Sequence, residues 1–214
     1  MPTLPLFPLR VVLYPHMPLP LHVFESRYRA LLRDCREDGG RFGVVAIRSG
    51  EEVGGAADPE PVGTVAVITK SVPLPEGRSS LLVVGGERYR IRQLVPGAPY
   101  LRAEVEYLDD PEPDPASFIL ASEARDAFLR YAARLARLSG RRPGTSPPPT
   151  DPLLLSWVIA SALMVELPHK QHLLEIEGVG TRLRAELALL RRELRLLDLD
   201  LANRVLPAPS FGRN

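Results

Sequence analysis

The prolines near the N-terminus restrict the fold of this chain more than any other feature. Residues 4–22 contain five of them: Pro5, Pro8, Pro15, Pro18 and Pro20. A proline fixes its own φ and moves the residue before it out of the helical region, so this stretch must be extended or turning. Residues 10–14 are the one longer part without proline, and their apolar run at 11–13 predicts a buried strand.

From residue 24 the apolar residues follow the spacing of an amphipathic helix. One apolar stripe, opposite charged residues, comprises Phe24, Tyr28, Leu31, Leu32 and Cys35. Gly39 and Gly40 predict the end of this helix. Cys35 is the only cysteine, so no intramolecular disulfide can form, and its place on the stripe favours a core position over a nucleophile.

Short apolar or alternating runs then predict a set of strands. They are residues 42–47, 62–72, 80–84, 87–94 and 100–108. Residues 49–61 and 73–79 are rich in Gly, Pro and Glu and predict loops. The first 110 residues are therefore expected to form a small, curled β domain that carries one helix.

After residue 111 the pattern becomes helical. Apolar residues recur in steps of three and four from Ala121 to Leu138 and again from Leu183 to Leu201, as in long amphipathic helices. Asp151-Pro152 has the form of a helix start, and Pro168 predicts the start of another helix. We therefore expect an α+β protein with a β domain at 1–112, a compact C-terminal helical bundle at 113–206 and a tail at 207–214.

Several segments together resemble the Lon protease N-terminal domain family. The resemblance covers nearly the whole chain and is most specific within residues 4–28. Its motifs are Leu4-Pro5-Leu6-Phe7-Pro8-Leu9, Val12-Leu13-Tyr14-Pro15, Leu19-Pro20-Leu21-His22-Val23-Phe24-Glu25, Arg27-Tyr28, Gly86-Glu87-Arg88-Tyr89-Arg90-Ile91, Tyr100-Leu101-Arg102-Ala103-Glu104-Val105-Glu106, Leu155 to Leu163, Lys170-Gln171-His172-Leu173-Leu174-Glu175 and Arg182-Leu183.

This resemblance implies a PUA-like β domain, a curled sheet or pseudo-barrel with one helix, followed by a helical bundle. In Lon proteases this region recognises unfolded or tagged proteins and passes them to an ATPase. The present sequence has neither a Gly-x-x-x-x-Gly-Lys motif nor a Ser-x-x-Lys motif. The expectation is therefore a stand-alone, non-catalytic form that lacks ATPase and protease domains.

The expected function is capture of unfolded or extended protein segments in an apolar groove between the β domain and the helices. Three aromatic residues are candidate contacts: Tyr14, Phe24 and Tyr89. A separate ATPase or protease is a further candidate partner, and the protein is expected to be a monomer or a weak dimer. The longest uncharged apolar run, residues 153–165, is too short to span a bilayer, which favours a cytoplasmic protein without a membrane partner.

RNA binding is the alternative function. A PUA-like protein could use an arginine-rich strand face, with candidate contacts Arg88, Arg90, Arg92 and Arg102. Neighbouring glutamates favour cross-strand Arg–Glu pairing instead, because Glu87, Glu104 and Glu106 lie on the same predicted strands. The overall charge is balanced, with 27 Lys and Arg against 26 Asp and Glu, so nucleic acid is not the expected partner.

Other chemistry has little support in the sequence. His169, His172 and Glu175 are spaced for a metal but no fourth ligand lies nearby, so neither a metal nor another cofactor is expected. No Gly-x-Ser-x-Gly motif occurs, and no enzyme activity is expected. Glu25 and Arg27 are too close in sequence to share a helix face, so each is expected to form a structural ion pair with another residue.

Overall fold

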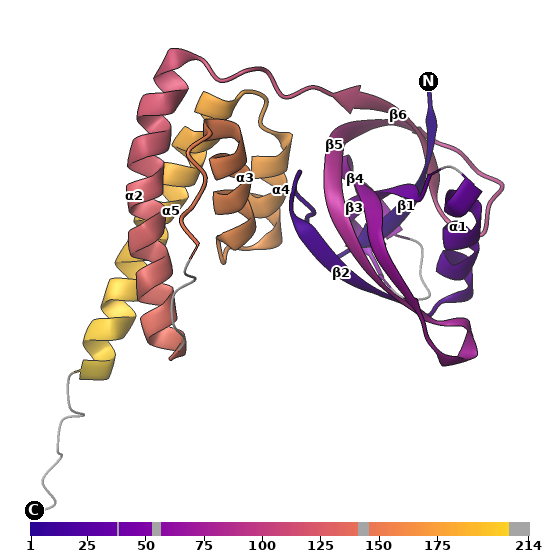
Figure 1. Ribbon diagram of the computed structural model, residues 1–214, viewed down its shortest axis with the longest axis horizontal. Helices are drawn as coiled ribbons and strands as arrows, with labels where there is room; N and C mark the ends of the chain where they lie inside the picture. The colour runs from indigo at the N-terminus through magenta and orange to yellow at the C-terminus, as the bar shows by residue number, and fades with distance from the viewer. Residues whose placement is uncertain (38, 53–56, 141–145, 206–214) are drawn as a thin grey trace, which may run out of the picture. The chain divides into compact units, whose positions relative to one another are not determined.

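The computed structural model describes residues 1–37, 39–52, 57–140 and 146–205. These residues form two compact units. The first contains Met1–Pro111 together with Ala160–Glu177, and the second contains Glu112–Ile159 together with the residues from Gly178 onward. Strands gather in the first unit and long helices in the second (Figure 1), which confirms the predicted α+β class.

The first unit is built on one mixed sheet. Its strands are β1 (Thr3–Leu9), β2 (Pro18–Val23), β3 (Arg41–Gly50), β4 (Ala57–Pro73), β5 (Ser79–Leu94) and β6 (Arg102–Leu108). They follow the order β2-β5-β4-β3-β1-β6, and β6 also pairs with β5. This last pairing closes five of the strands into a ring and leaves β2 on its outside. Among the described strands, β1 and β3 form the only parallel pair.

The strands near the N-terminus lie where the prolines are. The prediction of a strand at residues 10–14 is wrong, because β1 and β2 lie on either side of that segment. In β2 the side that faces β5 is fixed by a hydrogen bond from the Gly85 N–H to the Met17 carbonyl at 3.0 Å. Backbone groups of alternate residues point to opposite sides of a strand, so the backbone nitrogens of Pro18 and Pro20 point away from β5. The N–H groups that these prolines lack therefore cost no hydrogen bond between the two strands.

Strand β5 is longer than the sequence indicates. The sequence predicts two strands, at residues 80–84 and 87–94, but β5 continues through Gly85 and Gly86 to Leu94. Gly85 is needed there because a Cβ at this position would overlap the carbonyl of Tyr14. Part of the predicted loop at 49–61 is also strand, since β3 extends to Gly50 and β4 begins at Ala57.

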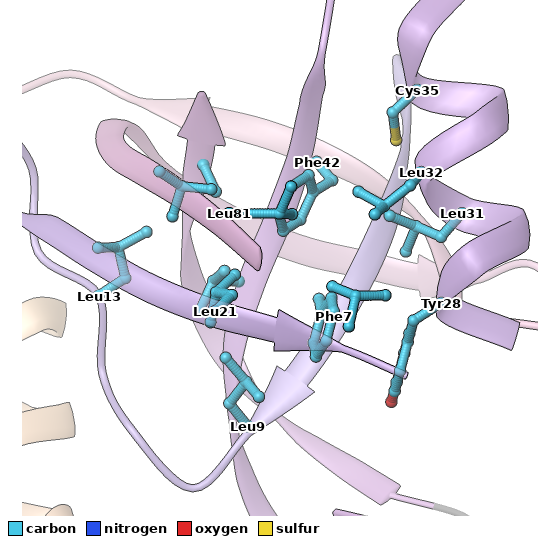
Figure 2. Close-up of a cluster of buried hydrophobic side chains, with 14 residues drawn as sticks. Phe7, Leu9, Leu13, Leu21, Tyr28, Leu31, Leu32, Cys35, Phe42 and Leu81 are labelled. Atoms are coloured by element: carbon cyan, nitrogen blue, oxygen red, sulfur yellow. The ribbon is translucent and has the colours of Figure 1, made fainter. Parts of the chain in front are cut away.

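Helix α1 (Ser26–Glu37) covers one core of this sheet, as the apolar stripe predicted. Figure 2 shows Leu31, Leu32 and Cys35 of α1 pointing toward the core residues of the strands. Phe7 of β1 stacks on Tyr28 of α1 with the ring centroids 4.0 Å apart. Full burial of a leucine or phenylalanine contributes about 1.5–3 kcal/mol, so this cluster is a main source of the stability of the unit.

A second core lies around Tyr89 of β5. Its ring fits against two glycines on neighbouring strands, and a Cβ on Gly43 or Gly63 would lie 2.5 Å from the Tyr89 hydroxyl. The hydroxyl donates to the carbonyl of Val44 at 3.2 Å. The other buried members of this cluster are Leu4, Leu6, Val45, Val65, Ala103 and Val105.

Helix α4 (Leu167–Glu175) belongs to the first unit although it lies far away in sequence. The expected boundaries place it with the other helices, whereas Ala160–Glu177 groups with the strands. Gln171 donates to the Val62 carbonyl at 3.0 Å, and the Tyr14 hydroxyl donates to the Lys170 carbonyl at 2.9 Å. These bonds attach the helix to β4 and to the turn before β2.

The second unit contains the helices α2 (Pro115–Ser139) and α5 (Val179–Val205) and most of α3 (Pro152–Ala162). Helices α2 and α5 lie side by side and run in the same direction (Figure 1), with ion pairs Glu123–Arg191 and Arg134–Asp198 along them. The predicted start of α3 is confirmed, because the Asp151 carboxylate accepts from the Leu154 N–H at 2.8 Å. A fully buried polar cluster joins α3 to α5: Ser156, Trp157, Arg182 and Glu186.

Candidate functional site

A groove of about 330 Å³ opens on the first unit where β1 and β2 meet the beginning of α1. We call it the β2 groove. Its lining is mainly apolar, which is typical of a site that takes an apolar ligand group. The lining residues are Phe7, Leu9, Val11, Leu19, Pro20, Leu21, His22, Phe24, Glu25, Tyr28 and Glu52.

The floor of the β2 groove is made by residues of the first core. Phe7, Leu9, Leu21 and Tyr28 all belong to that core and also line the groove. Figure 2 shows these four side chains on the side of the cluster away from Cys35. Because the floor is part of the packed core, its shape is held by the fold and does not depend on a mobile loop.

Tyr28 places a polar atom in this apolar floor. The residue is 3% exposed, and its hydroxyl has no hydrogen-bond partner among the residues that the structure describes. Burial raises the pKa of Tyr28 to about 12, so the hydroxyl keeps its proton and can donate. A buried donor without a partner is rare in folded proteins, and a ligand is one way to satisfy it.

The rim of the groove combines an exposed aromatic ring with charged groups. Phe24 lies just before α1 and is 48% exposed. The prediction that it belongs to the buried apolar stripe of this helix is therefore wrong. Glu25 and Arg27 bond to each other at 3.0 Å, and Arg27 also lies 4.6 Å from the centre of the Tyr28 ring. The prediction that each pairs elsewhere is wrong, because Glu25 precedes the helix and helical spacing does not apply to it.

The structure separates the three predicted aromatic contacts. Phe24 lines the groove, but Tyr14 is 2% exposed and Tyr89 is completely buried. Both tyrosine hydroxyls donate to backbone carbonyls inside the unit. The expectation that these two rings are accessible is therefore wrong, and Phe24 alone of the three can touch a partner in this conformation.

The predicted arginine face is largely used by the fold. Arg88 is fully buried and bonds to the Asp110 carboxylate at 2.9 Å and to the Leu174 carbonyl at 2.8 Å. Arg90 bonds to Glu177 at 3.2 Å. Arg92 bonds to Glu106 on the adjacent strand, as the cross-strand interpretation predicted, while Arg102 is partly exposed on β6. Three of the four guanidinium groups are thus matched by carboxylates.

Sequence reasoning missed most of this groove. The alternation of Leu19, Leu21 and Val23 in β2 was the available signal, since it predicts one inward face. Nothing in the sequence predicts that the Tyr28 hydroxyl lacks a partner, because the position of Tyr28 on the helix stripe indicates only that its ring is buried. Among the described residues no three metal-binding side chains lie together, and no helix is long and apolar enough to cross a membrane.

Comparison with known proteins gives concordant results. The family model described as the ATP-dependent protease La (LON) substrate-binding domain matches residues 3–192. Lon protease 2 of Myxococcus xanthus is 36% identical over 92% of this chain and 24% of its own length. Lon protease of Escherichia coli strain K12 is 31% identical over 94% of this chain and 26% of its own length. The chain thus spans about a quarter of these curated relatives.

Two solved structures share the fold. The Lon N-terminal domain protein from Xanthomonas campestris has a TM-score of 0.65 and 28% identity, covering 88% of this chain and 98% of that one. The N-terminal domain of Mycobacterium avium complex Lon protease has a TM-score of 0.67 and 20% identity, covering 89% of this chain and 98% of that one.

Proposed function

The chain belongs to the family of ATP-dependent protease La (LON) substrate-binding domains, and on that basis we propose that it is a non-catalytic protein-binding module. It captures unfolded or extended protein segments in the cytoplasm and delivers them to a separate ATPase or protease, as a monomer or weak dimer. The same relationship supports a PUA-like description of the closed sheet and a helical bundle for the helices after residue 112.

The observation that carries this proposal is the β2 groove with Phe24 on its rim. Unfolded chains differ from folded proteins in exposing apolar side chains together with backbone groups that lack partners. The groove offers a complement to both. Its apolar floor can bury a side chain of the client, and Phe24 can cover that side chain from above.

Tyr28 supplies the complement to the client backbone. In a folded client the carbonyl groups are already paired, whereas an extended segment has carbonyls that can accept a hydrogen bond. The Tyr28 hydroxyl keeps its proton because its pKa is about 12, and no described residue accepts it; a client carbonyl reaches it only by displacing the groove residues that cover the oxygen. The groove thus favours an extended segment over a folded surface.

Replacement of Phe24 by alanine tests the proposal. Burial of an aromatic ring contributes about 1.5–3 kcal/mol, so Phe24→Ala should weaken binding of a fluorescein-labelled unfolded-protein peptide by about tenfold or more. Fluorescence anisotropy measures this. Phe118→Ala is the matched control, because Phe118 is also exposed, at 56%, but lies on α2 in the other unit.

The two variants together decide the outcome. The proposal requires the Phe24 variant to bind more weakly while the Phe118 variant binds like the wild type. Equal affinities for all three proteins would reject the groove as the binding site. Absence of saturable binding by the wild type up to high micromolar peptide would reject the function itself.

A further inference from the structure

A second cavity of about 410 Å³ lies in the first unit. It shares helix α1 with the β2 groove but none of the residues that line that groove. It opens between α1 and the turn that joins β4 to β5. We call it the arginine cavity. Its lining residues are Ser26, Arg29, Leu32, Arg33, Gly77 and Ser79, none of which is acidic.

Arg29 and Arg33 of this cavity have no carboxylate partner among the residues that the structure describes. Most arginines on the strands bond to acidic residues, as Arg41 does to Glu87 at 2.7 Å and Arg48 to Asp58 at 2.7 Å. Arg29 instead donates to a neutral acceptor, the Glu76 backbone carbonyl, at 3.0 Å. Arg33 has no hydrogen bond or ion pair with any residue that the structure describes. Within the described part of the chain, no carboxylate balances either of these two positive charges.

The turn between β4 and β5 fixes the position of one of these charges. Gly77 has a φ of 71°, and a Cβ at this residue would lie 2.9 Å from the Arg29 Nη1 atom. Glu76, with a φ of 62°, turns its carbonyl toward the same guanidinium. A side chain at position 77 would displace Arg29, so this strained turn keeps the guanidinium in place without neutralising it.

Two hydroxyl groups complete the set of donors. Ser26 of α1 and Ser79 of β5 line the cavity from opposite elements. Neither hydroxyl has a hydrogen-bond partner within the described part of the chain. Arg29 and Arg33 are one helical turn apart, so their side chains can reach a common ligand. Guanidinium groups and hydroxyls are the donors that bind phosphate oxygens in proteins.

We propose that the arginine cavity is a binding site for a dianionic phosphate group, free or carried as a phosphate monoester on a small molecule. The double negative charge balances Arg29 and Arg33. Ser26 and Ser79 donate to the remaining oxygens, and the volume left over accommodates the rest of the ester. This site is separate from peptide capture, because it shares no lining residue with the β2 groove.

A nuclear magnetic resonance titration with inorganic phosphate tests this proposal. The 15N-labelled protein is titrated at constant ionic strength, and the amide shifts of residues 26–33 and 77–79 are followed. We expect saturable shifts at these positions. Loss of one charged donor should weaken a phosphate site by about tenfold, so Arg33→Gln should raise the dissociation constant by this factor.

Arg102→Gln is the matched control, because it removes one positive charge from β6, outside the cavity. It should leave the phosphate affinity unchanged. Equal weakening by both variants would show a general charge effect and overturn the proposal. Equal shifts with acetate would also overturn it, because a monoanion cannot balance two guanidinium groups. Phosphate shifts that do not saturate, or that lie elsewhere, have the same consequence.

Discussion

The unpartnered hydroxyl of Tyr28 gives the most specific test of how the β2 groove works. The variant Tyr28→Phe keeps the ring that stacks on Phe7 at 4.0 Å and removes only the hydroxyl. A buried polar group without a partner costs about 1–3 kcal/mol. Removing it should therefore raise the free energy of unfolding by about 1–3 kcal/mol.

The same variant should bind clients more weakly. A hydrogen bond between the Tyr28 hydroxyl and a client carbonyl contributes about 0.5–1.5 kcal/mol. The peptide dissociation constant should thus rise by about threefold to tenfold. Stability and affinity are predicted to change in opposite directions, which distinguishes a binding role from a packing role.

Urea unfolding followed by circular dichroism and peptide anisotropy are measured on the same preparations. Tyr14→Phe serves as the control, because the Tyr14 hydroxyl donates to the Lys170 carbonyl at 2.9 Å. This control should lose about 1 kcal/mol of stability and keep its affinity. The reasoning is refuted if Tyr28→Phe lowers stability, or if it leaves peptide affinity unchanged.

Two further predictions concern buried charges, one in each unit. Arg88→Met removes the guanidinium that bonds to Asp110 and to the Leu174 carbonyl, so it should cost about 3–5 kcal/mol in urea unfolding. Adding Asp110→Asn should recover part of this loss, and two independent, additive losses would argue against the pair. In the second unit, burial raises the pKa of Glu186 despite the nearby Arg182, so the stability associated with the protonated form is lost as pH rises above the unfolded-state pKa. The variant Glu186→Gln should therefore gain stability relative to the wild type as the pH rises. The difference between their free energies of unfolding is measured by the fluorescence of Trp157. A decrease of this difference with pH would mean that Arg182 keeps the carboxylate ionised.

The sequence was sufficient for elements whose local pattern decides their structure. The stripe of Tyr28, Leu31 and Cys35 specifies one face of a helix, and α1 buries that face. Asp151 has a side chain suited to the first turn of a helix, and it caps α3 as expected. These features need only neighbours within a few residues, so they survive without knowledge of the tertiary fold.

The errors came where distant segments decide the structure. Val11 and Val12 favour a strand by type, but β1 and β2 take the pairing positions and leave them in the connecting segment. Tyr89 was expected to be accessible to a partner, because nothing nearby in sequence indicates that Gly43 and Gly63 make the space for its ring. The placement of α4 with the strands depends in the same way on long-range bonds, such as that of Gln171 to the Val62 carbonyl.

The prolines of β2 also affect how readily another strand can pair with the edge of this sheet. A strand at the edge of a sheet exposes a row of N–H and C=O groups that can recruit another strand and start aggregation. The outward positions 18 and 20 have no N–H to offer, and the remaining strands of the first unit close on one another. If clients bind in the adjacent groove as proposed, they would find side-chain contacts but few backbone N–H groups with which to extend the sheet, and each could dissociate as a single chain.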